Sequence, residues 1–114
     1  MLTVGVGGRP GADLTALVAA ALDGIAARPD AIATIDRRAA EAAAVAAGYG
    51  CPVATFTAAE LAAQPVPTPS GAVAGAVGTP SVAEAAALLA AGPGARLLVA
   101  KRGNGTATVA VAVR

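Results

Sequence analysis

The 114-residue chain contains no histidine and no tryptophan, and it has one cysteine, one tyrosine and one phenylalanine. A single cysteine excludes an internal disulfide, and without histidine the usual zinc and non-haem iron ligand sets cannot be assembled. We therefore expect no protein-bound metal. A net charge of +1 and two aromatic residues provide neither the positive charge nor the stacking surface typical of nucleic-acid binding. We expect no nucleic-acid partner.

Long apolar runs are also missing, although 56% of the residues are hydrophobic. Asp23 interrupts the first helical run, and glycine, proline or a charged residue interrupts every other one, so no segment reaches the roughly 18 apolar residues that span a bilayer. The start MLTVGVGG lacks the cationic beginning and long apolar stretch of a signal peptide. We expect no membrane association and a cytoplasmic location.

Alanine supplies much of the hydrophobic content, with 35 residues, and valine is the commonest larger apolar residue. A chain of 10.7 kDa has the usual size of one domain, which we expect to cover residues 1–114. Because alanine is small, the sequence predicts helices that approach valine-rich strands closely.

Apolar periodicity predicts alternating strands and helices. The predicted strands are 2–6, 31–35, 53–56, 95–101 and 106–113, and the predicted helices are 14–25, 37–47, a short helix after Thr57, 70–77 and 85–91. Their expected caps are Asp13, Thr57 with Glu60, and Ser81 with Glu84 at the beginnings, and Gly48 and Gly92 at the ends.

The order of these elements predicts an α/β fold with a mostly parallel open sheet and helices on both faces. The two final strands are joined by Gly103-Asn104-Gly105, which tolerates positive φ, and they should form a C-terminal β-hairpin. We expect the last strand to be antiparallel and to lie at the edge of the sheet.

Five motifs occur in an order and spacing that match a known family. They are Gly5–Gly11, Ala33–Arg38, Phe56–Leu61, Gly78–Leu88 and Leu97–Lys101, and GTPSVAEAAAL is the most specific of them. Through these residues nearly the whole chain resembles the cobalamin-biosynthesis family that includes CobE and the C-terminal domain of CbiG. The resemblance implies a role in assembly of the corrin ring.

Two positions depart from the family's pattern. Gly8 stands where the family often has cysteine, which excludes a thiol mechanism at that position, and Arg38 stands where lysine is usual, which keeps the positive charge. The family's larger hydrolases, which open the ring-A lactone of cobalt-precorrin-5A, also carry domains outside the matched region.

Ligands of open parallel sheets bind beyond the carboxyl ends of the strands. Arg9 follows the first predicted strand, Arg37 and Arg38 follow the second, and Lys101 with Arg102 follow the fourth. Cations should therefore gather at this edge, although charged residues also collect in loops simply because strands exclude them. Corrin precursors carry many carboxylates, which match guanidinium groups and backbone N–H groups. The predicted ligand-binding residues are Gly7, Gly8, Arg9, Gly11, Asp36, Arg38, Thr79, Ser81 and Lys101.

Candidates for catalysis and for cofactor binding are few. Asp36 is the best candidate general base, whereas helix capping and the helix dipole suffice to explain Glu41. No histidine can activate Thr79 or Ser81 as a nucleophile. The glycines also depart from the dinucleotide fingerprint, because Gly11 comes one residue too late, and we expect no cofactor.

Three functions follow from the resemblance and the residues. The favoured one is a binding or accessory protein that holds or hands over a carboxylate-rich precorrin or cobalt-precorrin intermediate. The second is hydrolysis of cobalt-precorrin-5A with Asp36 as general base. The third is a structural partner of a precorrin methyltransferase, or of another corrin-pathway enzyme, that uses its apolar helix faces.

Overall fold

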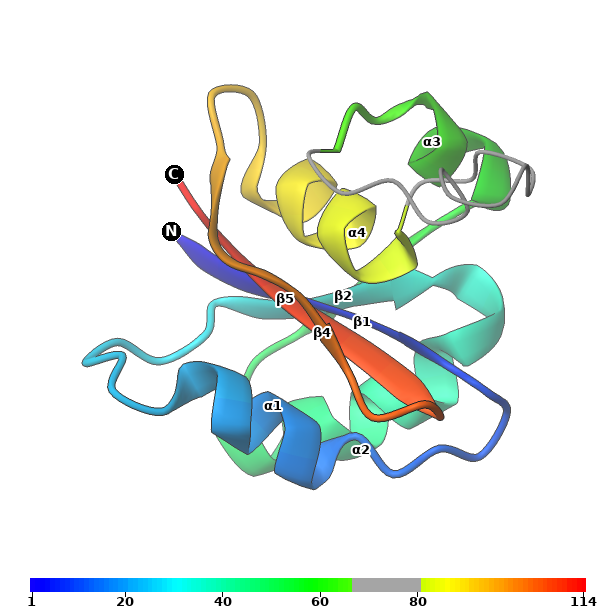
Figure 1. Ribbon diagram of the computed structural model, residues 1–114, viewed down its shortest axis with the longest axis vertical. Coiled ribbons are helices and arrows are strands. Elements are labelled where there is room, and N and C mark those ends of the chain that lie inside the picture. The colour runs from blue at the N-terminus through cyan, green and yellow to red at the C-terminus, as the bar shows by residue number, and fades with distance from the viewer. Residues whose placement is uncertain (67–80) are drawn as a thin grey trace.

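Five strands form one mixed sheet in the order β3-β2-β1-β5-β4 (Figure 1). The computed structural model describes residues 1–66 and 81–114, so the predicted helix 70–77 and Thr79 lie outside the described residues. The elements are β1 (Leu2–Gly8), α1 (Thr15–Leu22), β2 (Ala31–Ile35), the 3-10 helix η1 (Asp36–Arg38), α2 (Ala39–Tyr49), β3 (Val53–Phe56), α3 (Ala58–Ala63), α4 (Val82–Ala91), β4 (Arg96–Gly103) and β5 (Ala107–Val113).

The strand directions bear out the predicted α/β class and the C-terminal hairpin. Strands β1, β2 and β3 pair in parallel, and β5 pairs antiparallel with both β1 and β4. The expected edge position of the last strand is wrong, because β5 lies between β1 and β4, and β4 forms the edge. It follows that β4 runs in the same direction as β1.

Helices cover both faces of the sheet, with α1 and α2 on one side and α3 and α4 on the other (Figure 1). Side chains of a strand alternate between the two faces. Val4 and Val6 accordingly join the core formed with α1 and α2, while Thr3 faces α4 and donates its hydroxyl hydrogen to the Ala87 carbonyl at 2.7 Å. The two faces of β1 therefore pack against different helices, one face against α1 and α2 and the other against α4.

The close approach expected of alanine-rich helices occurs at Gly5. A Cβ atom added there would lie 1.8 Å from the Ala83 carbonyl oxygen of α4, which is far inside van der Waals contact. Ala83 and Ala87 are themselves fully buried. Glycine on β1 and alanine on α4 therefore bring the two backbones into direct contact.

The predicted helix boundaries are correct in some places and wrong in others. Thr57 and Glu60 form the predicted capping box. The first helix is shorter than the predicted 14–25, with Leu14 as its N-cap residue, and Asp13 accepts the Thr15 N–H at 3.0 Å from one residue before the cap. The C-terminal cap of α2 is Gly50, with φ of 64°, so the prediction of Gly48 is wrong. Tyr49 extends the helix past Gly48, and the left-handed conformation that glycine favours comes at the later glycine.

None of the helices in the described part of the chain has the length and apolarity needed to cross a membrane.

Candidate functional site

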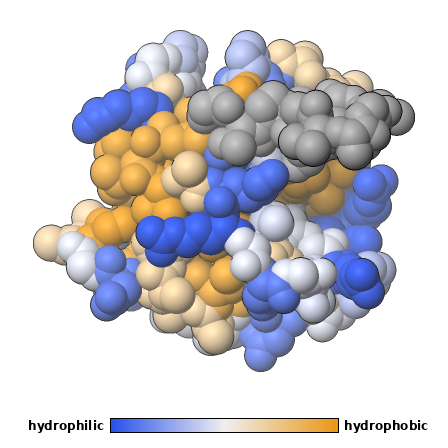
Figure 2. Space-filling model, in the orientation of Figure 1, coloured by the Kyte–Doolittle hydropathy of each residue, from blue (hydrophilic) through white to orange (hydrophobic). Residues whose placement is uncertain are grey.

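The carboxyl ends of four strands meet at one edge of the sheet, which we call the carboxyl edge. Strands β1, β2 and β3 are parallel, and β4 shares their direction. Helix α4 begins at the same edge, because a Cβ atom on Gly7 would lie 3.2 Å from Val82 Cβ. Figure 2 shows hydrophilic residues along the right-hand side of the molecule, where the carboxyl edge lies.

The loop after β1 is a tight turn from Arg9 to Ala12. The Ala12 N–H donates to the Arg9 carbonyl at 3.1 Å, Pro10 occupies the second position, and Gly11 has φ of 78°, which together are typical of a type II turn. Glu41 accepts the Gly11 N–H at 2.7 Å. This bond lowers the pKa of the Glu41 carboxyl below its ordinary value of 4.5, and it ties the turn to the first turn of α2.

Gly7 and Gly8 belong to β1 itself, whereas the sequence predicted that the strand ends at Val6. The Gly7 position is crowded by Thr108 Oγ1, 3.0 Å from an added Cβ, and the Gly8 position by Ala107 Cβ at 3.1 Å. Packing explains both glycines, so the interpretation of Gly7 and Gly8 as a ligand-binding loop is not needed to account for them. Among the predicted glycines, only Gly11 lies in a turn after the strand.

The residues after β2 form the short helix η1. Asp36 is exposed, and its carboxylate accepts the Arg37 N–H at 2.7 Å. Arg38 is half-buried and folds back, donating from Nε to the Gly8 carbonyl at 2.9 Å and from Nη1 to the Arg37 carbonyl at 2.9 Å. Arg38 therefore holds the end of β1 against the end of β2, a role that the sequence did not suggest.

Helix α4 is capped at the carboxyl edge by Ser81. Its buried hydroxyl oxygen accepts the Glu84 N–H at 3.4 Å, so one half of the predicted capping box is present. The Glu84 carboxylate is fully buried and accepts the Lys101 N–H of β4 at 2.9 Å. The capping-box pattern gave no signal for this second contact.

Lys101 lies inside β4, as the predicted strand 95–101 has it, and is half-buried. The expectation that the strand ends there is wrong, because Arg102 and Gly103 also belong to β4. The strand continues to Gly103 because β4 and β5 stay paired as far as Gly103 and Thr108. Arg102 is the exposed residue next to it. The hairpin thus presents its cations from the strand and not from the turn.

The carboxyl edge carries as many carboxylates as cations. Five carboxylates at this end of the sheet each accept a backbone N–H group, and they are Asp13, Asp36, Glu41, Glu60 and Glu84. Within residues 1–66 and 81–114, by contrast, the side chains of Arg9, Arg37 and Arg102 make no hydrogen bond, and all three are exposed. The acidic groups therefore serve the local backbone, while three guanidinium groups face solvent.

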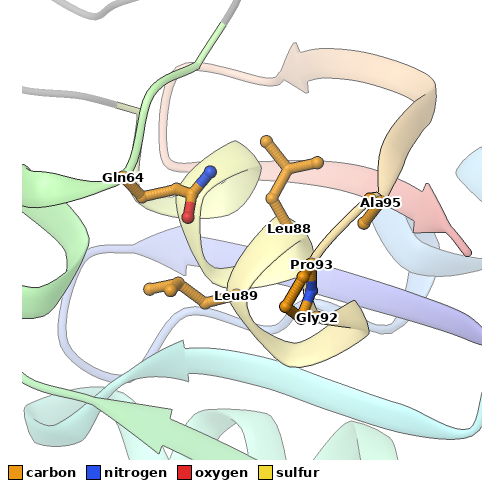
Figure 3. Close-up of a pocket in the computed structure, with 7 residues that line it drawn as sticks. Gln64, Leu88, Leu89, Gly92, Pro93 and Ala95 are labelled. Carbon is orange, nitrogen blue, oxygen red and sulfur yellow. The ribbon is translucent and has the colours of Figure 1, made fainter.

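A pocket of about 230 Å³ lies at the other end of α4 (Figure 3). Gln64, Leu88 and Leu89 border it on one side and Pro93 and Ala95 on the other. Pockets that bury a drug-sized ligand usually measure about 300 to 1,000 Å³, so this pocket is too small for a corrin ring. The pocket is also separate from the carboxyl edge, because α4 begins at that edge with Val82 and ends near Gly92.

Comparisons with known proteins place this fold in one family. The family model described as "Cobalamin synthesis G C-terminus" matches residues 2–112. The chain belongs to this family, and it is thus a cobalamin-biosynthesis protein of the CobE and CbiG type. A comparison with curated protein sequences found no significant match.

Three solved structures are similar. CobE, a protein from the cobalamin (vitamin B12) biosynthetic pathway, superposes with a TM-score of 0.78 at 32% identity, over 98% of this chain and 92% of CobE. The cobalamin biosynthesis protein chiG of Agrobacterium tumefaciens gives a TM-score of 0.72 at 34% identity, over 99% and 98% of the two chains. A cobalamin biosynthesis protein G homolog from Sulfolobus solfataricus shares the fold, with a TM-score of 0.76 at 21% identity over 97% of this chain and 36% of that chain.

Proposed function

We propose that the protein binds or hands over a carboxylate-rich corrin intermediate at its carboxyl edge. The observation that carries this proposal is the contrast between the carboxylates of the edge, which accept backbone N–H groups, and the exposed guanidinium groups of Arg9, Arg37 and Arg102. Guanidinium groups form paired hydrogen bonds with carboxylates. A ring bordered by acetate and propionate groups is a matched ligand for cations spread along one edge.

The ligand class comes from the family to which the chain belongs. Precorrin and cobalt-precorrin intermediates carry peripheral carboxylates around a flat ring, and neither form requires a metal held by the protein. Because cations and carboxylates at the edge are equal in number, long-range attraction of an anion should be weak, and recognition should depend on short contacts. We therefore propose recognition by individual Arg–carboxylate pairs, and we propose a cytoplasmic location for the protein.

The hydrolase alternative assigns the general base to Asp36. Its carboxylate is exposed and accepts the N–H of the next residue at the start of η1, which is a local backbone contact and not an arrangement specific to catalysis. A docking role for the helix faces has less support, since Met1 and Leu98 are the only large hydrophobic residues exposed in the described part of the chain. We therefore favour the accessory role.

The test compares two arginines of the same strand. Arg102 lies near the carboxyl end of β4 and Arg96 at its opposite end, and both are exposed. Arg9→Ala and Arg102→Ala should weaken binding of cobalt-precorrin-5A by about 1 to 3 kcal/mol each, or about five- to 150-fold in Kd. Arg96→Ala removes the same charge from the other edge and should leave Kd unchanged.

Absorbance titration measures these affinities, and a ring whose side-chain acids are esterified serves as the matched ligand control. If the wild-type protein binds neither ring, the ligand proposal fails. An equal loss for Arg96→Ala and Arg102→Ala would mean that only net charge matters and would remove the carboxyl edge as the site. Release of a two-carbon fragment, lost in Asp36→Asn, would replace the accessory role with the hydrolase.

A further inference from the structure

Strand β4 carries one extra residue close to the carboxyl edge. Val99 aligns with Val111 and Arg102 with Val109, so Ala100 and Lys101 together stand opposite one residue of β5. Such a β-bulge leaves a backbone group of the extra residue outside the ladder and changes which way the following side chains face. The bulge occurs just before the exposed Arg102.

Glu84 of α4 contacts the backbone of β4 at this bulge. Its carboxylate, which is 0% exposed, accepts the Lys101 N–H at 2.9 Å. In the same sequence pattern on α3, Glu60 instead turns back and accepts the Thr57 N–H at 2.9 Å. The pattern that makes a capping box on α3 therefore makes a helix-to-strand contact on α4.

The bulge determines on which face of the sheet Arg102 stands. Val109 belongs to the core shared with α1 and α2, so Arg102, its aligned partner, follows that face. In a strand without the extra residue, Lys101 would align with Val109 and Arg102 with Thr108, and the two cations would exchange faces. The extra residue thus sets the arrangement of both cations, and the Glu84 contact lies at that residue.

We propose that Glu84 is a positioning residue that holds the β4 bulge and thereby sets the faces on which Lys101 and Arg102 stand. The contact joins the first turn of α4, capped by Ser81, to the strand that carries the cations. The importance of this arrangement for ligand recognition rests on the proposed function. The register of β4 itself does not, and it can be measured without any ligand.

Three substitutions of Glu84 test this inference. Glu84→Gln keeps the length and an acceptor oxygen, Glu84→Asp keeps the charge but is one methylene shorter, and Glu84→Ala removes the acceptor. Interstrand NOEs should join Arg102 to Val109 in the wild type and in Glu84→Gln. In Glu84→Asp the Lys101 amide should exchange roughly tenfold faster or more, and the NOE pattern should move by one residue.

If Glu84→Ala does not fold, Glu84→Asp and Glu84→Gln still decide the matter. A folded Glu84→Asp or Glu84→Ala protein with the wild-type NOEs and a protected Lys101 amide would overturn the proposal, because β5 alone would then fix the bulge. Titration with cobalt-precorrin-5A adds a separate readout, in which Glu84→Asp should lose affinity as Arg102→Ala does. Failure of the wild type to bind would refute the ligand proposal and leave the register result unaffected.

Discussion

Replacing Gly5 with alanine is expected to destabilise the protein more than any other single-methyl change at the glycines of β1. The added Cβ would lie 1.8 Å from the Ala83 carbonyl oxygen and 2.7 Å from the Ala87 nitrogen. Both neighbours are backbone atoms of α4, so no side chain can move aside. The helix must retreat by about 1.5 Å, or the strand must distort, in an interior packed without spare volume.

The cost should exceed the usual range for added methyl groups in a core. We expect Gly5→Ala to lower the free energy of unfolding by about 3 kcal/mol or more. With a urea m-value of about 1.5 kcal/mol/M, the unfolding midpoint should fall by about 2 M. Far-UV circular dichroism is the suitable probe, since the chain lacks tryptophan.

Alanine substitutions at two other glycines serve as references for the stability loss in Gly5→Ala. Gly48 lies on α2 with no atom within 4 Å of an added Cβ, and Gly48→Ala should stabilise the protein by about 0.5 to 1 kcal/mol. Gly7 meets Thr108 Oγ1 at 3.0 Å and Val82 Cβ at 3.2 Å, and Gly7→Ala should cost about 1 kcal/mol. A Gly5→Ala midpoint within about 0.3 M of the wild type would show that α4 does not rest on β1 as described.

Two further predictions concern the turn after β1. Arg38→Ala should lower the free energy of unfolding by about 1 kcal/mol and speed amide exchange next to Gly8, because the bond to the Gly8 carbonyl is lost. Arg38→Lys should keep part of this stability. Equal amide exchange in both variants would contradict the structural role. The Gly11 N–H lowers the Glu41 pKa, so the stability from this contact is present above pH 4.5 and is lost as the pH falls through the lowered pKa. The NMR chemical shift of the Gly11 amide should therefore titrate below pH 4.5. In Glu41→Gln this shift should not titrate.

Local patterns predicted much of the fold. The bounds of β2 and β3 coincide with the predicted 31–35 and 53–56, since short apolar runs between turn residues define strands without reference to the rest of the chain. The place of β5 between β1 and β4 could not be predicted in this way. Pairing between the first and last strands is not local, and the sequence order alone favours an outer position for the last strand.

The candidate site was predictable as an edge but not as a set of contacts. The resemblance and the strand ends indicated Arg9, Asp36 and Arg38, and all three lie at the carboxyl edge. Their hydrogen bonds were not predictable, because Arg38 folds onto the Gly8 carbonyl only when β1 and β2 lie side by side. A capping-box pattern likewise cannot reveal that Glu84 turns towards β4, since this contact joins two elements that are not adjacent in the sequence.

The irregular course of β4 has a consequence for behaviour in concentrated solution. An open edge strand can pair with the edge of another molecule and start aggregation. The outer strand here has register shifts at two places, between Leu97 and Val99 and between Val99 and Arg102, and it carries exposed arginines at 96 and 102. A second strand would meet an interrupted ladder and repelling charges at β4, so the same bulge that arranges the cations also protects this edge of the sheet, though not the β3 edge, from strand addition.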